Sequence, residues 1–581
     1  MSTHWTRTFT EDELPRGSRK VFKHAHHQIA VFHLDDGEIF AVDNRCPHEG
    51  YPLAQGVLDG CTLTCSWHNF KFDLRDGACL KGEEAVKSWP VRRREGVIEV
   101  DLTEPDPATL RPAIFESLAG ALYERRPGQL ARDVVRLLQT GDDHEMSAEI
   151  LAYAAAEDCQ RGQYGNDHGL PVAADTFRVI ELLIADGRVD PLEARVVALT
   201  QALEMNALFL VRRPRRPMYP ALAVDEGWGE ALLESVEKED LPRAEGLLRG
   251  MLDTGASVEE VMPWLIRVNA AHLLSFGHGL IYVVKAFELL ESVGWPLASE
   301  ILPGVLTSLV NGTREDTLPA WRSFNARMAE RLEAVLPHVE GLEGEGDPIA
   351  RGQLAERLLE APTSGAVDVI LDAVVDGASL VTCAEAVALA ASRRLARFDP
   401  EIDRRLDVQD TWLFATHLLT HAEALLVALP HVGDRRAALR LVCLAARFVV
   451  GGRASDAPEW QPPTPAGDAE LLWASLKGGD REGVLASAEA LMANGQIDVI
   501  EQQIIHHTIM GDHVARAIFL AHHVKTPIAA CRLARRLKSP WPIRGVMHWL
   551  TSASRERVVV QQAKEAIALV TEGRTPKMLW K

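Results

Sequence analysis

Two short segments of this chain, one at Cys46 and the other at Cys65, carry closely spaced cysteine and histidine residues. The first reads Cys46-x-His48, and after sixteen further residues the second reads Cys65-x-x-His68. Four of the eight cysteines lie between Cys46 and Cys79. In a reducing compartment such clustering is typical of metal or redox sites rather than of disulfide scaffolds. The spacing therefore predicts a metal site built from two thiolates and two imidazoles.

The residues around this motif predict a small all-β domain. Between residues 21 and 102, short apolar or alternating runs such as QIAVFHL, GEIFAVDN and LTCSWH are separated by turn signals. Asp36-Gly37 and Asp76-Gly77 each separate two strand-like runs, and these residue pairs tolerate the positive φ that tight hairpin turns need. We therefore expect hairpins at both positions.

Both ligand loops resemble those of the Rieske family, in which two histidines replace two of the four cysteines that hold a [2Fe-2S] cluster. The likeness rests on CPHEGYPLAQG, CTLTCSWHNFKFD and the following FDLRDG segment, and it covers about residues 5–103. It implies that Cys46 and Cys65 bind the inner iron, whereas His48 and His68 bind the outer iron nearer the surface. The residue types alone leave a Cys₂His₂ zinc site open as the alternative.

The resemblance is to the ferredoxin and oxygenase branch of that family. Rieske proteins of respiratory complexes carry one more cysteine in each loop, and the two form a disulfide. Tyr51 and Trp67 stand at the matching positions here, so no such bridge is expected. Cys61 and Cys79 are interpreted as small buried hydrophobic residues. The domain is expected to transfer single electrons.

The composition and the hydrophobic pattern of the sequence change after this domain. Residues 104–115 contain three prolines and are interpreted as a linker. Residues 116–581 are rich in Ala, Leu, Glu and Arg, and their apolar residues recur every three or four positions, which is typical of amphipathic helices. The predicted fold is a small all-β domain (1–103) followed by a large all-helical, repeat-like region. Breaks between helical subdomains are expected near 341–348 and 453–467.

Histidines in the helical region lie within or beside apolar helices. His417 and His421 are four residues apart, which places both rings on one helix face, as in helical bundles that supply two ligands to one metal. We therefore predict a second site, which binds iron. Its candidate ligands are His144, His272, His278, His417, His421, His507 and His513, and the candidate catalytic residues among them are His278, His417, His421 and His513.

Further donors and an alternative complete this prediction. The adjacent pairs His506-His507 and His522-His523 can each direct only one ring to a common site. For any single histidine, a packing role in the core is the alternative. Carboxylate companions of the kind that non-haem iron prefers are Glu145, Glu288, Glu423 and Asp512.

The segments HLLSFGHGLIYVVKAFELLE and ATHLLTHAEALLVALP also resemble the questin oxidase-like family of polyketide tailoring enzymes. That resemblance implies an oxidase or monooxygenase that acts on an aromatic or polycyclic compound. It places His272, His278, His417 and His421 near the site.

Two main functions are therefore weighed. The first is a Rieske oxidoreductase that passes electrons to an iron-dependent, O₂-using site acting on a small organic, aromatic or polyketide substrate. The alternative is a ferredoxin-like electron carrier whose helices only bind a protein partner, with a redox sensor as a third reading. No glycine-rich dinucleotide fingerprint follows a strand, so we expect an external reductase or ferredoxin to supply the electrons.

Composition restricts the partners and the location. The formal net charge of −20 and the shortness of the basic runs 92–94 and 212–216 argue against a nucleic-acid partner. No run reaches the roughly 18 uninterrupted apolar residues of a membrane-spanning helix. The first residues show no secretory signal. We expect a cytoplasmic protein.

Overall fold

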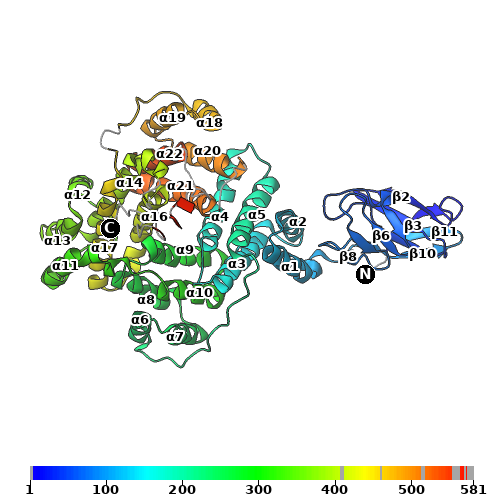
Figure 1. The fold of residues 1–581 in the computed structure, drawn as a ribbon, viewed down its shortest axis with the longest axis horizontal. Coiled ribbons are helices and arrows are strands. Elements are labelled where there is room, and N and C mark those ends of the chain that lie inside the picture. The colour runs from blue at the N-terminus through cyan, green and yellow to red at the C-terminus, as the bar shows by residue number, and fades with distance from the viewer. Residues whose placement is uncertain are drawn as a thin grey trace. The chain divides into compact units, whose positions relative to one another are not determined.

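The computed structural model describes residues 4–405, 408, 411–457, 461–511 and 517–552, together with 563–564, 566–567 and 571. Its contacts divide the chain into two compact units. Unit 1 comprises Met1–Ala121 and Arg126–Met146, and unit 2 comprises Leu122–Arg125 and Ser147–Lys581. Strands are labelled only in the amino-terminal part of Figure 1, and the remainder is drawn as helices. The predicted fold class is confirmed.

Unit 1 begins with three small antiparallel sheets. Their strand orders are β1-β11-β10, β2-β3-β4-β9 and β5-β6-β7-β8. The strands are β1 (Trp5–Thr10), β2 (Ser18–His24), β3 (His27–His33), β4 (Ile39–Asp43), β5 (Val57–Asp59), β6 (Thr62–Thr64), β7 (Lys71–Asp73), β8 (Cys79–Lys81), β9 (Ser88–Trp89), β10 (Val91–Arg94) and β11 (Val97–Asp101).

Strand β3 explains how the ligand loops are supported. Successive side chains of a strand point to opposite faces, and here both faces are buried. Ala30 and Phe32 belong to the core cluster that also contains Cys46 and Cys65. Ile29 and Val31 belong to a second core cluster with residues of β9 and β11. The unbroken apolar run of β3 therefore places one hydrophobic core directly behind the two loops.

The two predicted hairpins are confirmed. Asp36-Gly37 joins the antiparallel strands β3 and β4, and Asp76-Gly77 joins β7 and β8. The φ of Gly77 is +80°, and a Cβ at this position would lie 1.9 Å from the carbonyl oxygen of Val86. Only glycine fits this second turn.

The segment 104–115 differs from the predicted linker, because helix α1 (Pro107–Glu124) begins within it. Asp106 accepts a hydrogen bond from the N–H of Ala108 at 3.1 Å, as a helix N-cap residue does. Pro107 follows at the first helical position, where a missing N–H is harmless. The sequence Asp-Pro is therefore a helix start in this chain. Helix α2 (Pro127–Leu138) follows, and unit 1 extends to Met146.

Unit 2 is built from helices in the described residues. Helices α4, α9, α16 and α21 pack against one another at its centre. The remaining bounds are α3 (Asp143–Arg161), α4 (Gly169–Asp186), α5 (Pro191–Leu210), α6 (Trp228–Glu237), α7 (Leu241–Asp253), α8 (Val258–Ala271), α9 (His278–Val293), α10 (Ala298–Val310), α11 (Arg322–Val335), α12 (Pro348–Glu360), α13 (Ala366–Val375), α14 (Leu380–Arg397), α15 (Pro400–Arg404), α16 (Trp412–Ala428), α17 (Arg435–Gly451), α18 (Ala469–Gly478), α19 (Arg481–Ala493), α20 (Ile497–Met510), α21 (Ala517–Leu537) and α22 (Trp541–Leu550).

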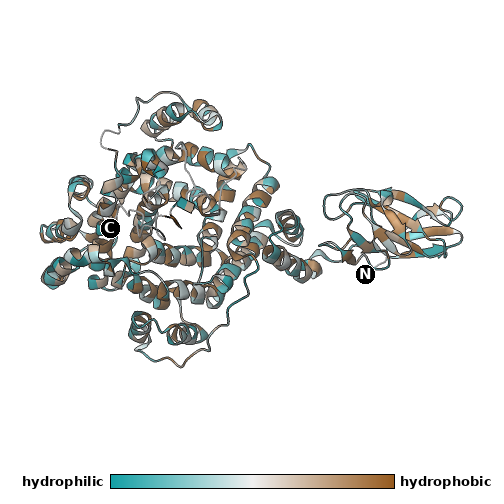
Figure 2. Cartoon of the chain, in the orientation of Figure 1, coloured by the Kyte–Doolittle hydropathy of each residue, from teal (hydrophilic) through white to brown (hydrophobic). Residues whose placement is uncertain are grey.

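The described helices of unit 2 carry both hydrophobic and hydrophilic residues, as the mixed brown and teal ribbons of Figure 2 show. One described segment, Trp412–His431, is long and apolar enough to cross a membrane, but 89% of its most apolar window is buried inside the protein. This segment contains α16, the central helix of unit 2. The expected breaks at 341–348 and 453–467 contain non-helical residues, and both lie within unit 2.

Candidate metal centres

The two loops that carry the cysteine and histidine motif, 46–51 and 65–70, fold in the same way. In each loop the N–H of the first residue donates to the carbonyl of the sixth, and the N–H of the fifth donates to the carbonyl of the first. The fifth residues, Gly50 and Asn69, have φ of +75° and +60°. Glycine and asparagine adopt this left-handed conformation most readily. The strand expected at 63–68 ends at Thr64 because the second loop turns there.

The four donors of these loops meet in pairs. Cys46 and Cys65 are buried, and burial, together with the adjacent Cys65 thiol, raises the pKa of Cys46 to about 11. The Nδ1 atoms of His48 and His68 are 3.2 Å apart. Two ligand atoms on one tetrahedral metal, with bonds of about 2.1 Å, are separated by about 3.4 Å. Two adjacent thiols and two converging imidazole nitrogens fit a [2Fe-2S] cluster with two histidines on one iron.

Aromatic rings surround the imidazoles of these loops. Tyr51 and Trp67, which stand where Rieske proteins of respiratory complexes have cysteines, contact each other with ring centroids 5.9 Å apart. Phe70 stacks on His48 at 4.7 Å. Every cysteine of the chain is free. Half of the Trp67 side chain is exposed, so the histidine end of this site faces solvent.

Helix α2 is fastened to the first ligand loop within unit 1. Arg132 donates from its guanidinium to the backbone carbonyl of His48 at 3.0 Å and pairs with Glu84 at 2.9 Å. Arg136 pairs with the same carboxylate. A cavity of about 1080 Å³ lies beside these residues and is also lined by Cys46. Helix α2 therefore restrains the loop that carries His48.

Comparisons with known proteins agree with this geometry. The profile of the Rieske [2Fe-2S] domain matches residues 4–92. The 3-phenylpropionate/cinnamic acid dioxygenase ferredoxin subunit of Photorhabdus laumondii is 38% identical over 98 residues, which are 16% of this chain and 91% of that protein. The chain belongs to the Rieske [2Fe-2S] family. Its Rieske domain is of the type that holds a [2Fe-2S] cluster and transfers electrons.

Other relatives cover different shares of their own length. Cholesterol 7-desaturase of Hemicentrotus pulcherrimus is 31% identical over 133 residues, which are 20% of this chain and 28% of that enzyme. The ferredoxin of Sphingomonas yanoikuyae B1 is 26% identical over 17% of this chain and 100% of its own, with a TM-score of 0.16. None of the three relatives covers more than a fifth of this chain, and the questin oxidase-like resemblance of the helical region stays a prediction.

A second group of donors lies at the centre of unit 2. It consists of His168 beside the start of α4, His278 as the first residue of α9, His417 on α16 and His522 on α21. His168, His417 and His522 are buried, and each offers one ring nitrogen within 4.8 Å of the others. His278 joins them, with its ring centroid 4.2 Å from that of His417.

Hydrogen bonds fix which nitrogen faces the centre in three of the four rings. Nδ1 of His168 bonds to the Asp167 carboxylate at 2.9 Å. Nδ1 of His278 bonds to the carbonyl of Ser275. A carboxylate and a carbonyl only accept, so both Nδ1 atoms carry the proton and both Nε2 atoms present a lone pair when the rings are neutral.

His522 follows the same rule through a hydroxyl group. Its Nδ1 lies 2.8 Å from Oγ1 of Thr416. The Thr416 hydroxyl donates to the carbonyl of Leu413 at 2.8 Å, so it accepts from His522. The Nε2 atoms of His522 and His417 are buried and have no hydrogen-bond partner in the described structure. An outward Nδ1–H with an inward Nε2 is the usual arrangement of metal-binding histidines.

The charge state of these rings supports the same conclusion. Nε2 of His168 and Nε2 of His278 are only 3.3 Å apart. Burial, followed by the charge of Lys525, lowers the pKa of both rings. Two neutral rings that each carry the proton on Nδ1 bring two lone pairs together, which is repulsive unless a cation lies between them. The distance matches the 3.2 Å between His48 and His68.

A strained loop positions His278. Ser275, Phe276 and Gly277 have φ of +48°, +58° and +82°, and a non-glycine residue in this region costs about 1–3 kcal/mol. The carbonyl of Gly277 accepts from Nδ1 of His421 at 3.2 Å. The N–H of Phe276 donates to the buried carboxyl group of Glu315 at 3.0 Å. Neighbouring side chains therefore hold the loop in place.

His421 borders the group and does not face its centre. Its Nδ1 is directed to the loop before α9, and its Nε2 has no partner among the described residues. Burial lowers the pKa of His421 to about 4. His421 therefore positions the segment that carries His278.

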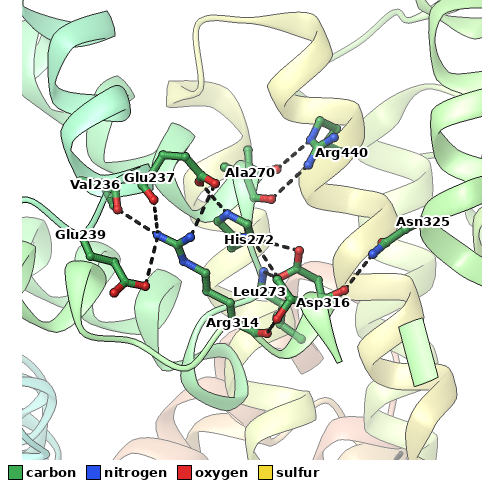
Figure 3. A network of polar contacts seen from close by, with 12 residues as sticks. Val236, Glu237, Glu239, Ala270, His272, Leu273, Arg314, Asp316, Asn325 and Arg440 are labelled. Atoms are coloured by element: carbon green, nitrogen blue, oxygen red, sulfur yellow. Dashed lines mark hydrogen bonds and ion pairs between the residues drawn. The ribbon is translucent and has the colours of Figure 1, made fainter. Parts of the chain in front are cut away.

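Other predicted ligands lie elsewhere. His272 bonds through Nδ1 to Asp316 at 3.0 Å and through Nε2 to Glu237 at 2.8 Å, as Figure 3 shows. Burial alone would lower the pKa of His272, but these two carboxylates outweigh burial and raise it. A ring with both nitrogens bonded to carboxylates is protonated and has no lone pair for a metal.

The remaining candidates do not join the group either. His144 and Glu145 are exposed residues at the start of α3, and His507 lies on α20 outside the donor group. His506 pairs with Asp186, and His523 contacts Trp549. Glu288 and Glu423 are engaged by Arg532, and Glu288 also by Lys285. Asp512 and His513 lie outside the described residues.

Two members of the site, His168 and Lys525, were missed by sequence analysis, and His522 was named only as one of an adjacent pair. His168 follows Gly165-Asn166-Asp167, so it lacks the apolar neighbours that drew attention to the other histidines. The preceding Asp167 was the available signal, because a carboxylate partner commonly orients a ligating histidine. Lys525 is 1% exposed, and its Nζ has no hydrogen-bond partner in the described part of the chain.

Proposed function

We propose that this protein is an oxidoreductase that transfers electrons from its [2Fe-2S] cluster to an iron site in unit 2. Cys46 and Cys65 would hold one iron of the cluster, and His48 and His68 the other. Their adjacent thiols and converging Nδ1 atoms support this assignment. A Rieske cluster changes charge by one electron at a time and does no substrate chemistry alone.

The second site would be held by His168, His278, His417 and His522. The observation that carries this proposal is the shared orientation of the rings: Nδ1 is bonded outward in His168, His278 and His522, which leaves their Nε2 atoms for a metal. Ring nitrogens of His168, His417 and His522 lie within 4.8 Å of one another, and Nε2 of His278 lies 3.3 Å from Nε2 of His168. Bound iron would supply O₂ reduction there. Imidazole suits iron, copper and zinc alike, and the attached Rieske domain favours the redox-active iron.

The residues of the chain prepare this site for oxidative chemistry. Burial keeps the four imidazoles neutral, so their lone pairs are free for a metal. Helices α4, α9, α16 and α21 pack around the site. A cavity of about 540 Å³ reaches His168 and His278 from the side of Asn166 and Asn311. A small organic substrate would enter there and be oxidised.

The electron source would be a separate reductase or ferredoxin. The half-exposed Trp67 beside His48 and His68 leaves the cluster accessible to such a partner. The relative from Photorhabdus laumondii is named as a ferredoxin subunit of a dioxygenase. This name favours a second candidate, an electron carrier whose helical unit binds a partner protein.

Metal content separates the two candidates. Iron and acid-labile sulfide are measured on the anaerobically purified full chain, with an EPR spectrum after dithionite reduction. We expect about three irons for two sulfides, because the cluster supplies only two irons. Equal amounts of iron and sulfide after incubation with ferrous iron would contradict the second iron site and favour the electron carrier. Activity toward candidate aromatic substrates with an added reductase would then test the oxygenase reaction itself.

A further inference from the structure

The cavity that reaches His168 and His278 has a cation in its wall. Arg213 lines it, together with polar side chains and the rings of Tyr164 and Tyr282. Arg213 is half-buried, and no ion pair engages its guanidinium in the described structure. Its charge acts on the Asp158 and Asp167 carboxyl groups, with which the described structure shows no ion pair.

The neighbouring arginines show that a guanidinium without an ion pair is unusual in this part of the chain. Arg213 belongs to the short basic run 212–216, and the other three arginines of that run are neutralised. Arg212 pairs with Glu124, Arg215 with Glu157 and Arg216 with Glu245. Of this run, only Arg213 lines the cavity. A partly desolvated guanidinium that forms no ion pair is a strong site for a carboxylate or phenolate.

The carboxylate of the cavity is already occupied. Asp167 accepts hydrogen bonds from both the backbone N–H and the Nδ1–H of His168 at 2.9 Å, so one of its carboxylate oxygens is engaged by His168. Asn311 donates to the carbonyl of Thr307, which leaves its side-chain oxygen for the cavity. The phenol of Tyr282 stays neutral because burial raises its pKa well above the usual value. The wall therefore offers both polar groups and aromatic rings.

We infer that this cavity binds an aromatic organic anion, with Arg213 holding its acidic group and the ring facing His168 and His278. A volume of about 540 Å³ suits a molecule of one to a few rings. This inference rests on the proposed function, because it gives the substrate class of the same site. Arg213 acts here as a specificity-determining residue.

Matched ligand pairs test the inference. Binding of benzoate against benzamide, and of 2-naphthoate against 2-naphthamide, is measured by titration calorimetry on the full-length protein at pH 7. We expect at least one carboxylate to bind tenfold or more tightly than its amide. Arg213→Gln should abolish this preference, and Arg213→Lys should keep part of it. Absence of any preference, or its survival in Arg213→Gln, overturns the inference.

Arg212→Gln is the matched control, because it removes the same charge from the adjacent, exposed residue. The Arg213 backbone carbonyl, which accepts from Arg161 at 2.7 Å, is unchanged in every variant. The same titrations after iron removal distinguish the two proposals. If the preference depends on bound iron and not on Arg213, the anion binds the metal. That result overturns the inference about Arg213 but not the proposed function. If the protein binds no third iron even when ferrous iron is supplied, but still shows an Arg213-dependent preference, the proposed function is overturned and the anion site remains.

Discussion

The two candidate metal centres solve the same geometric problem in different ways. In unit 1, two histidines meet through Nδ1 at 3.2 Å on β-loops, beside two thiols and open to solvent. In unit 2, two histidines at the starts of α4 and α9 meet through Nε2 at 3.3 Å, among packed helices and beside a cavity. The first site is made by local hydrogen bonds within two short loops. The second exists only when four helices from distant parts of the chain pack together.

The difference has a chemical consequence. Two thiolates give the unit 1 site negative charge, which suits an iron–sulfur cluster that only exchanges electrons. The compact donor group of unit 2 contains imidazoles alone in the described residues, so a bound metal would keep its positive charge. Such a metal attracts anions. The electron-transfer site and the proposed second metal site would thus differ in net charge as well as in access.

The largest effect is expected from the first site. Cys65→Ser removes one thiolate from the loop, so the Rieske EPR signal and the acid-labile sulfide should be lost almost completely. Cys61→Ser is the matched control, because Cys61 only packs against the same core. Retention of the full signal in Cys65→Ser would show that the ligands are assigned wrongly. Circular dichroism should show that unit 2 keeps its helices.

The second effect separates the two sites directly. His522→Ala should remove the iron that exceeds the sulfide content, with a loss of affinity greater than about 100-fold. The cluster EPR signal should be unchanged. His523→Ala is the neighbouring control, because that ring contacts Trp549 and lies outside the donor group. Equal iron content in His522→Ala and wild type would contradict a second metal site that includes His522 and would favour a packing role for this residue.

A smaller effect is expected from the hydroxyl group behind His522. Thr416→Val removes the acceptor that fixes the tautomer of His522, and we expect iron affinity at the second site to fall about 10- to 100-fold. Thr420→Val lies one turn later on α16 and removes a hydroxyl that contacts only the backbone carbonyl of Thr416. Competition with a chelator of known affinity gives both values. Equal affinities in the two variants would contradict a positioning role for Thr416.

The smallest effect concerns the histidine that pairs with carboxylates. Asp316 and Glu237 raise the pKa of His272, so the folded state binds more protons than the unfolded state above about pH 6.5. The free energy of unfolding should therefore fall as the pH rises through this raised pKa. Because Glu237 is largely exposed, the contribution is on the order of 1 kcal/mol. Urea unfolding of wild type and His272→Gln between pH 6 and 9 measures it, and parallel curves would contradict it.

Individual residues show how far the sequence predicted the sites. His272 and His278 are six residues apart in one segment and looked equivalent. His272 ends α8 and faces two carboxylates, whereas His278 begins α9 after a loop of three left-handed residues. Nothing in the hydrophobic pattern marks that loop, because its strain is held by Glu315 and His421 from other parts of the chain. His168 was missed for a related reason, since its partners are distant in sequence.

The sequence by itself determined the Rieske site. Its donors lie within 23 residues, and each loop closes through hydrogen bonds between a cysteine and residues four and five positions later, so spacing alone specifies the geometry. Only the tertiary structure decided the imidazole group. Residues from 168 to 522 meet because the apolar faces of α4, α9, α16 and α21 pack together, and burial among those helices makes the rings neutral. A pattern of apolar-flanked histidines predicts neither the helix packing nor the neutral state of the rings. Packing partners and protonation states are not local properties of a chain.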